Sequence, residues 1–181
     1  NMKKLLIFLF AFILILTGCG KNETNTPKGE VQKLFSDYTS LSSDVLIQLD
    51  SVMASENLTE SQINTYKDVI KRQYKDLKYK ITDEVVTNDK AVVTTEIEVY
   101  DLRKVIDDAD KYLESNKEEF YKEGTTTTDT SKFWDYKLEN MKKMTDRVKY
   151  TIDFSLTKIE NEWKLDDLLE IDRQKIHGLY K

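Results

Sequence analysis

The sequence predicts an α+β fold in which an antiparallel sheet packs on amino-terminal helices. Two observations predict it. Apolar residues recur every three or four positions from residue 31 to residue 77, and at every second position from 91 to 99 and from 148 to 156. The first period is that of amphipathic helices, and the second is that of strands buried on one face. The sheet should therefore be covered on one side and exposed to water on the other.

The helices should come first. One helix is expected from Val31 to Ala54, where the apolar residues form a continuous stripe. A second helix is expected from about residue 60 to 77. Thr59 and Gln62 have the spacing of a capping box, in which each side chain binds the backbone N–H of the other residue. Together the two helices would supply the layer on which the sheet packs.

A hairpin and a helical insertion should follow. The alternating residues from Tyr79 to Val86 and from Ala91 to Val99 predict two strands joined by a turn at residues 87 to 90. Asp101 can cap a third helix. Its apolar stripe runs from Leu102 to Leu113, and the helix is expected to end between Leu113 and Phe120. The polar segment from 124 to 131 is a predicted loop, and a shorter fourth helix is expected from Phe133 to Val148.

The last elements form a second hairpin. Val148, Tyr150, Ile152, Phe154 and Leu156 alternate with polar residues, which predicts a half-buried strand. Residues 160 to 162 are expected to turn the chain into a strand that contains Trp163 and Leu165, and residues 168 to 171 to close the strand region. A short helix around residues 173 to 177 should end at Gly178.

An export signal is predicted at residues 2 to 18. Lys3 and Lys4 precede an unbroken apolar run of twelve residues, Leu5 to Leu16. As a helix this run is about 18 Å long, whereas the hydrocarbon core of a bilayer is about 30 Å thick. The run therefore fits the core of a signal peptide better than a membrane span.

The segment Leu16-Thr17-Gly18-Cys19 resembles the lipobox that bacterial lipoprotein-processing enzymes recognise. The resemblance implies cleavage between Gly18 and Cys19, and a diacylglyceryl group on the Cys19 thiol. Such proteins often carry a second acyl chain, such as palmitate, on the new amino group. The chain contains one cysteine, so lipidation would leave none for a disulfide.

The predicted organisation is a lipidated Cys19 with a flexible tether up to residue 30, followed by one domain over residues 31 to 181. The segment from Gly20 to Glu30 has no hydrophobic residue and contains the only proline. The net charge of −5 argues against nucleic acid as a partner and against electrostatic docking on an anionic membrane. The expected membrane partner is therefore reached through the lipid on Cys19.

The order of elements, together with the closing segment Glu162-Trp163-Lys164-Leu165-Asp166-Asp167-Leu168, resembles the nuclear transport factor 2-like (cystatin-like) cone. In that fold a curved antiparallel sheet wraps around a helix. The chain also resembles small uncharacterised lipoproteins of low-GC Gram-positive bacteria, which implies a location on the outer face of the cell membrane. The helical insertion after the first hairpin departs from the simplest cone.

Catalytic and metal-binding patterns are scarce. His177 is the only histidine, and we interpret it as a surface or interface residue at a helix end. Asp107, Asp108 and Asp110 lack the ligand spacing of an EF-hand, because Tyr112 and Leu113 occupy positions five and six counted from Asp108. With no glycine-rich phosphate loop either, no metal, cofactor or catalytic residue is predicted. Asp166 and Asp167 are expected to be surface charges at a strand end.

Aromatic residues are the remaining candidates for a binding site, because the chain has ten tyrosines, seven phenylalanines and two tryptophans. Six of them could line the mouth of a cone, where hydroxyl and indole N–H groups would orient a ligand. These are Tyr66, Tyr74, Trp134, Tyr150, Phe154 and Trp163. The alternative is ordinary packing in the core.

Two functions remain open. The first is a non-enzymatic module of the cell envelope that binds a small ligand or an envelope protein. The second is a cone-fold isomerase or hydrolase that uses a carboxylate and a tyrosine in its pocket. The receptor of an uptake transporter is disfavoured, because such receptors have two α/β lobes and the pattern here supplies neither.

Overall fold

A computed structural model describes residues 25 to 181 of the 181-residue chain. Four strands form one sheet: β1 (Lys78–Thr87), β2 (Lys90–Tyr100), β3 (Arg147–Ile159) and β4 (Glu162–Leu165). The helices in this range are α1 (Pro27–Thr39), α2 (Ser43–Ala54), α3 (Glu60–Lys75), α4 (Leu102–Ser115), the 3₁₀ helix η2 (Lys117–Phe120), α5 (Thr130–Lys143) and α6 (Glu170–Ile176). The fold is α+β, as the sequence predicts.

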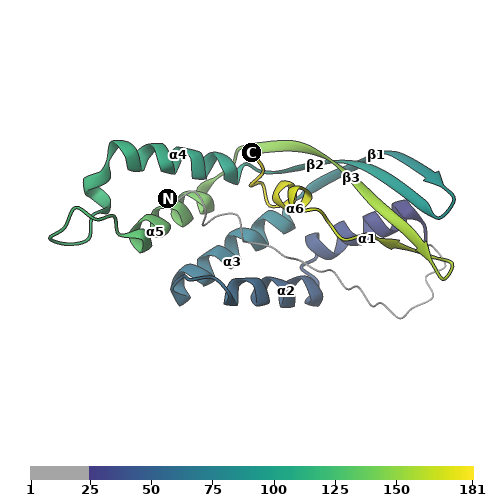
Figure 1. Ribbon diagram of the computed structural model, residues 1–181, viewed down its shortest axis with the longest axis horizontal. Coiled ribbons are helices and arrows are strands. Elements are labelled where there is room, and N and C mark those ends of the chain that lie inside the picture. Colours follow the sequence, from purple (N-terminus) through teal and green to yellow (C-terminus); the bar gives the residue numbers. More distant parts are fainter. Residues whose placement is uncertain (1–24) are drawn as a thin grey trace.

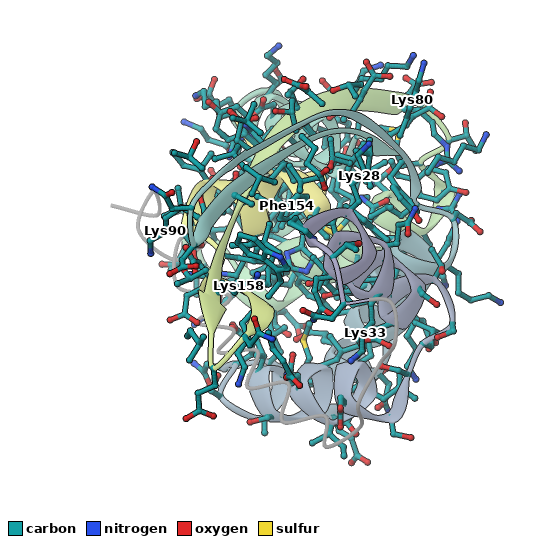
Figure 2. The ribbon with its side chains drawn as sticks, turned by 90° about the vertical axis from the view of Figure 1, so that its right-hand side faces the viewer. Lys28, Lys33, Lys80, Lys90, Phe154 and Lys158 are labelled. Atoms are coloured by element: carbon teal, nitrogen blue, oxygen red, sulfur yellow. The ribbon has the colours of Figure 1, made fainter. Side chains whose placement is uncertain are left out.

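The sheet is antiparallel throughout, with strand order β1-β2-β3-β4. On β2 every second residue from Ala91 to Val99 is buried, and on β3 Ile152, Phe154 and Leu156 are buried and alternate with exposed residues, so the predicted alternation is confirmed in both strands. Val93 pairs with Phe154 and Ala91 with Leu156, which places the apolar residues of the two strands on the same face. Figure 2 shows the strands curving around α1 on this face.

The single helix predicted from Val31 to Ala54 is wrong, because the chain breaks at residues 40 to 42. Leu41 has φ of 50°, and the Ser42 hydroxyl accepts a hydrogen bond from the Val45 N–H and starts α2. Serine favours such capping positions over a helix interior. Both helices bury their apolar residues in one core, so the apolar period continues across the break.

Helix α1 begins at Pro27, so it includes the last four residues of the segment predicted as a tether. The Thr26 hydroxyl accepts a hydrogen bond from the Gly29 N–H at 3.0 Å. Pro27 occupies the first turn, where a residue without an N–H is tolerated and φ is already helical. Two local signals therefore start the helix at a point where no hydrophobic residue marks it.

Several predicted boundaries are confirmed by their hydrogen bonds. Thr59 and Gln62 form the capping box of α3, and the Asp101 carboxylate caps α4 by accepting from the Lys104 N–H. The β1–β2 turn contains Asn88 in a left-handed conformation. Gly178, with φ of 69°, follows α6 as predicted.

Two boundaries near the C-terminal half differ from the prediction. Helix α5 ends at Lys143, short of the expected end at Val148, and Val148 lies in β3, as predicted for that strand. The strand region does not extend to residues 168 to 171, because β4 ends at Leu165 and α6 begins at Glu170. Leu168, in the connection between them, is buried in the main core, so its apolar character reflects core packing rather than a strand.

The predicted helical insertion forms a hairpin of α4, η2 and α5 with its own small core. This second core contains Ala109, Leu113, Phe120 and Phe133, with Tyr112 and Tyr136 packed against it. Figure 1 shows α4 and α5 at one end of the long axis and the β1–β2 turn at the other. No helix within residues 25 to 181 combines the length and apolarity needed to cross a membrane.

Candidate functional site

The structure corrects the interpretation of His177. Its side chain is buried rather than exposed, and its Nε2 lies 2.6 Å from the Tyr74 hydroxyl. Burial, and to a lesser extent the charge of Arg173, lower the pKa of His177 to about 3, while a hydrogen bond with the Arg173 backbone acts in the opposite direction. The only histidine of the chain is thus held neutral inside the fold, where it joins α6 to α3.

A pH dependence of stability follows from this burial. His177 takes up a proton in the unfolded chain below its ordinary pKa of 6.5, but in the folded chain only near pH 3. The contribution of neutral His177 to the free energy of unfolding is therefore fully present above about pH 6.5 and is lost as the pH falls. Between pH 6.5 and about pH 4.5 this proton should lower the free energy of unfolding by about 2.5 kcal/mol.

Urea unfolding across this pH range checks the prediction, with His177→Gln as the comparison because glutamine does not titrate. Carboxyl groups such as Asp172, whose pKa is raised mainly by burial, act in both chains alike. The stability advantage of the natural chain over the variant should shrink as the pH falls. An advantage that stays constant with pH would contradict the assignment.

Only one of the six predicted pocket residues lines either of the two surface grooves described below. Five are buried in the main core, as ordinary packing requires: Tyr66, Tyr74, Trp134, Phe154 and Trp163. Phe154 packs edge-on against Phe35 of α1, with ring centroids 5.6 Å apart. Only Tyr150 is partly exposed and lines a surface groove. Cys19 and Gly18, the predicted lipidation and cleavage residues, lie outside the described range.

The candidate binding surface lies instead along α4, which has an open groove on each side. The first, here called the α4–α5 groove, has a volume of about 320 Å³. Its lining comes from α4, α5 and the connection to β3: Val105, Asp108, Ala109, Tyr136, Asn140, Lys143, Met144, Thr145 and Asp146. Apolar, cationic and anionic groups thus line one opening, so a ligand with mixed chemistry fits it better than a purely apolar one.

The second opening, here called the C-terminal groove, has a volume of about 410 Å³. It lies between the first turns of α4, the start of β3 and the C-terminal tail, and is lined by Asp101, Arg103, Lys104, Asp107, Asp108, Lys111, Val148, Tyr150, Tyr180 and Lys181. The Tyr150 hydroxyl donates to the Tyr180 carbonyl at 3.3 Å, and the two rings meet edge to face. These contacts hold the tail against the sheet.

The wall between the grooves is fixed by hydrogen bonds. The Asp101 N–H donates to the Asp146 carbonyl, and the Lys104 ammonium donates to the Asp146 carboxylate at 2.9 Å. That second bond raises the pKa of Lys104. The Arg103 N–H donates to the Gly178 carbonyl at 2.7 Å. The start of α4 is therefore joined to β3 and to the C-terminal tail.

Lys137 of α5 is a feature that the sequence reading missed. Its side chain is buried, and its ammonium nitrogen lies 3.7 Å from the centroid of the Trp134 ring. Burial lowers its pKa to about 8, while the charge of Asp110 acts in the opposite direction. The spacing of Trp134 and Lys137, three residues apart on one helix, was the available signal, because residues so spaced share a helix face.

The acidic residues that invited a calcium interpretation are separated on α4. Asp107 and Asp108 line the C-terminal groove, whereas Asp110 is absent from the lining of both grooves. Within residues 25 to 181, no group of three or more His, Cys, Asp or Glu side chains is placed to hold a metal ion. Asp166 and Asp167 are exposed, and the Asp166 carboxylate accepts a hydrogen bond from Thr157.

Comparison with known proteins gives one similar structure. No protein-family model matches the chain, and no curated protein is significantly similar to it. The crystal structure of YcdA, a proposed lipoprotein of Bacillus subtilis, is similar with a TM-score of 0.45 and 14% sequence identity. The similarity covers 76% of this chain and 46% of YcdA, so the chain spans less than half the length of that protein. A likeness at this level does not define a family.

Proposed function

We propose that the protein is a lipoprotein anchored on the outer face of the cell membrane, and that its domain is a non-enzymatic binding module. One observation carries the proposal: the sole cysteine stands directly after Leu16-Thr17-Gly18, at the end of the apolar run that begins at Leu5. A short basic head, an apolar run too short to span and a small-residue cleavage site form the expected signal. The lipid on Cys19 is the proposed anchor.

We further propose that the module binds its partner through the grooves along α4. Both openings are surface grooves lined by groups of both charges, together with Tyr136 in one and Tyr150 in the other. Tyrosine is common in protein interfaces because it combines apolar area with a hydroxyl group. A polypeptide segment of another envelope protein is the partner that such an open, mixed surface fits best.

The proposal includes the finer fold assignment, a nuclear transport factor 2-like cone. Helix α1 packs on the inner face of the sheet, where Phe35 contacts Phe154 and stacks on Tyr79 at 4.4 Å. The closing segment Trp163-Lys164-Leu165 forms β4, at the edge of the sheet. The α4–η2–α5 hairpin would then be an insertion between the second and third strands.

One observation favours the alternative, an isomerase or hydrolase: Asp108 and Tyr136 line the same groove. A carboxylate that acts as a general acid near neutral pH usually gains its raised pKa from burial. Asp108 is exposed, which leaves it in contact with water. The one histidine is already engaged by Tyr74 in the core. We therefore favour binding over catalysis.

Charge reversal in the α4–α5 groove tests the binding function. The chain from Cys19 to Lys181 is incubated with proteins extracted from the envelope of its own cells, and bound proteins are identified by cross-linking and mass spectrometry. Lys143→Glu should weaken capture of a specific partner by about tenfold, because like charges at an interface oppose binding. Lys132→Glu, an exposed change on α5 that lines neither groove, is the matched control.

Equal capture by both variants would contradict the assignment of the groove. Substrate turnover by the purified chain that is lost in Asp108→Asn, but kept in Asp110→Asn, would overturn the non-enzymatic function. In that case the alternative enzyme function would be adopted.

A further inference from the structure

The structure fixes the place at which the amino-terminal segment leaves the domain. The Asn25 side chain accepts a hydrogen bond from the Trp163 N–H at 2.6 Å and donates to the Trp163 carbonyl at 3.0 Å. It also donates to the Glu30 carboxylate at 2.9 Å. Both backbone groups of Trp163 on the outer edge of β4 are thereby satisfied by one amide side chain. Residue 25 is held at this edge of the sheet.

The opposite edge of the sheet holds the next residues. The Glu84 carboxylate of β1 accepts a hydrogen bond from the Lys28 N–H at 3.1 Å, at the start of α1. A carboxylate at this position also complements the positive end of the helix dipole. The segment from 25 to 28 is therefore bound at both edge strands, β4 and β1. These contacts with the folded domain fix the direction in which the amino-terminal segment leaves it.

The two turns of the sheet lie at the same end as this segment. The β3–β4 turn, Glu160 and Asn161, comes two residues before Trp163, and the Lys158 N–H donates to the Asp89 carbonyl in the β1–β2 turn. We call this the hairpin end, defined as residues 84 to 92 and 157 to 163. Figure 1 shows the β1–β2 turn far from α4 and α5, at the other end of the long axis.

Six residue steps separate Cys19 from Asn25. A fully extended chain covers at most about 3.6 Å per residue, so Asn25 lies within about 22 Å of the Cys19 backbone along any path. That reach is short compared with the length of a folded domain. If Cys19 carries lipid, the hairpin end is the part of the domain that the chain brings to the bilayer.

The surface of the hairpin end suits this position. Four of its aliphatic side chains are exposed: Val85 at 55%, Val86 at 49%, Val92 at 38% and Ile159 at 49%. The adjacent Val85 and Val86 point to opposite faces of the strand. In Figure 2, which views this end, Lys28, Lys90 and Lys158 lie on different sides of the buried Phe154. Aliphatic groups beside lysines are typical of surfaces that rest in the headgroup region.

Acidic residues balance these lysines. Asp89, Glu160 and Glu162 are exposed at this end, Glu84 is partly exposed there, and Asp83 lies on the adjoining part of β1. Attraction to anionic lipids is therefore a weak contribution at best. The proposed contact with the bilayer therefore rests on the short connection to Cys19 and on the exposed aliphatic residues.

We propose that the hairpin end docks on the lipid bilayer, so that the long axis of the domain stands away from the membrane and the grooves along α4 face outwards. The inference rests on the proposed lipid anchor at Cys19. It assigns a membrane contact to aliphatic side chains that are exposed in the described chain. It also places the candidate binding surface where another envelope protein can reach it.

The orientation can be measured on vesicles with the chain from Cys19 to Lys181. Cys19, the only thiol, is coupled to a maleimide lipid in phosphatidylcholine vesicles that contain an acceptor-labelled lipid. A donor dye is attached through an introduced azide side chain, either at Asn161 in the hairpin end or at Thr126 in the loop between η2 and α5. Energy transfer should be about twofold higher from Asn161, given the short reach of the chain.

The aliphatic residues are tested in the same assay. Val86→Asp combined with Ile159→Asp should lower transfer from Asn161 by about a third, because charged side chains leave the interface. Ile47→Asp, on α2 and also at an exposed isoleucine, should leave it unchanged. Circular dichroism confirms that each variant is folded. Equal transfer from both dye positions, or no response to the paired aspartates, would overturn the proposal.

Chemical coupling separates this inference from the proposed function. The vesicle assay reports how the domain sits once Cys19 is attached to lipid, whether or not cells attach it. A failed orientation test would leave the lipoprotein assignment intact. If cells do not lipidate the chain, this orientation has no role in the cell, although the vesicle result would still hold.

Discussion

Replacing Gly178 by alanine is expected to lower the free energy of unfolding by about 3 kcal/mol, from left-handed strain and overpacking together. The φ angle of Gly178 is 69°, and a Cβ atom there would lie 2.0 Å from the Tyr100 carbonyl oxygen and 2.6 Å from the Gln73 Nε2. Neither contact can be relieved cheaply. The Gln73 amide donates to the carbonyls of Tyr100 and His177, and its oxygen accepts from the Tyr100 N–H.

Gly124→Ala is the matched control for this change. Gly124 has a similar φ of 72°, but a Cβ atom there meets nothing within 4 Å. Its substitution should cost about 1 kcal/mol, the left-handed strain alone. Urea unfolding of both variants gives the comparison. Equal losses would show that the close packing of Gly178 against β2 and α3 contributes nothing measurable.

Replacing Cys19 by serine is expected to leave the protein without lipid and with its signal segment still attached, so that it migrates at a higher apparent mass than the natural chain. Serine has no thiol to form the thioether, so neither lipidation nor the cleavage that follows it should occur. Separation of membrane and soluble material, followed by immunoblotting, measures the shift. Because the uncleaved signal segment also holds the variant at the membrane, the apparent mass decides the outcome rather than the fraction in which the protein is found.

Gly20→Ser is the control for the Cys19 substitution, because it alters the neighbouring residue and keeps the thiol. It should stay in the membrane fraction with the natural chain. Membrane-bound Cys19→Ser at the same apparent mass as the natural chain would contradict anchoring through the thioether.

The parts of the fold that sequence could predict are those with one buried face. On β2, Val93 and Ile97 alternate with exposed or partly exposed residues, and the strand follows from that period alone. The break at Leu41 could not be inferred in the same way, because both α1 and α2 face one core. The apolar period reports which residues are buried, and the buried residues continue across the point where the helix is interrupted.

The candidate site was less accessible to sequence reasoning. Each groove combines segments that are far apart in the chain, such as Asp108 of α4 with Lys143 of α5, and only the docking of the helical hairpin brings them together. His177 was misjudged because a residue near a chain end is usually exposed. Its burial depends on Tyr74, more than one hundred positions earlier in the chain.

Mass spectrometry of the amino-terminal peptide, from protein purified out of cell membranes, tests the central claim most directly. The account predicts a peptide that starts at Cys19 and carries the mass of a diacylglyceryl group, with or without a further acyl chain on the amino group. A peptide that starts elsewhere, or an unmodified Cys19 in membrane-bound protein, would contradict the account.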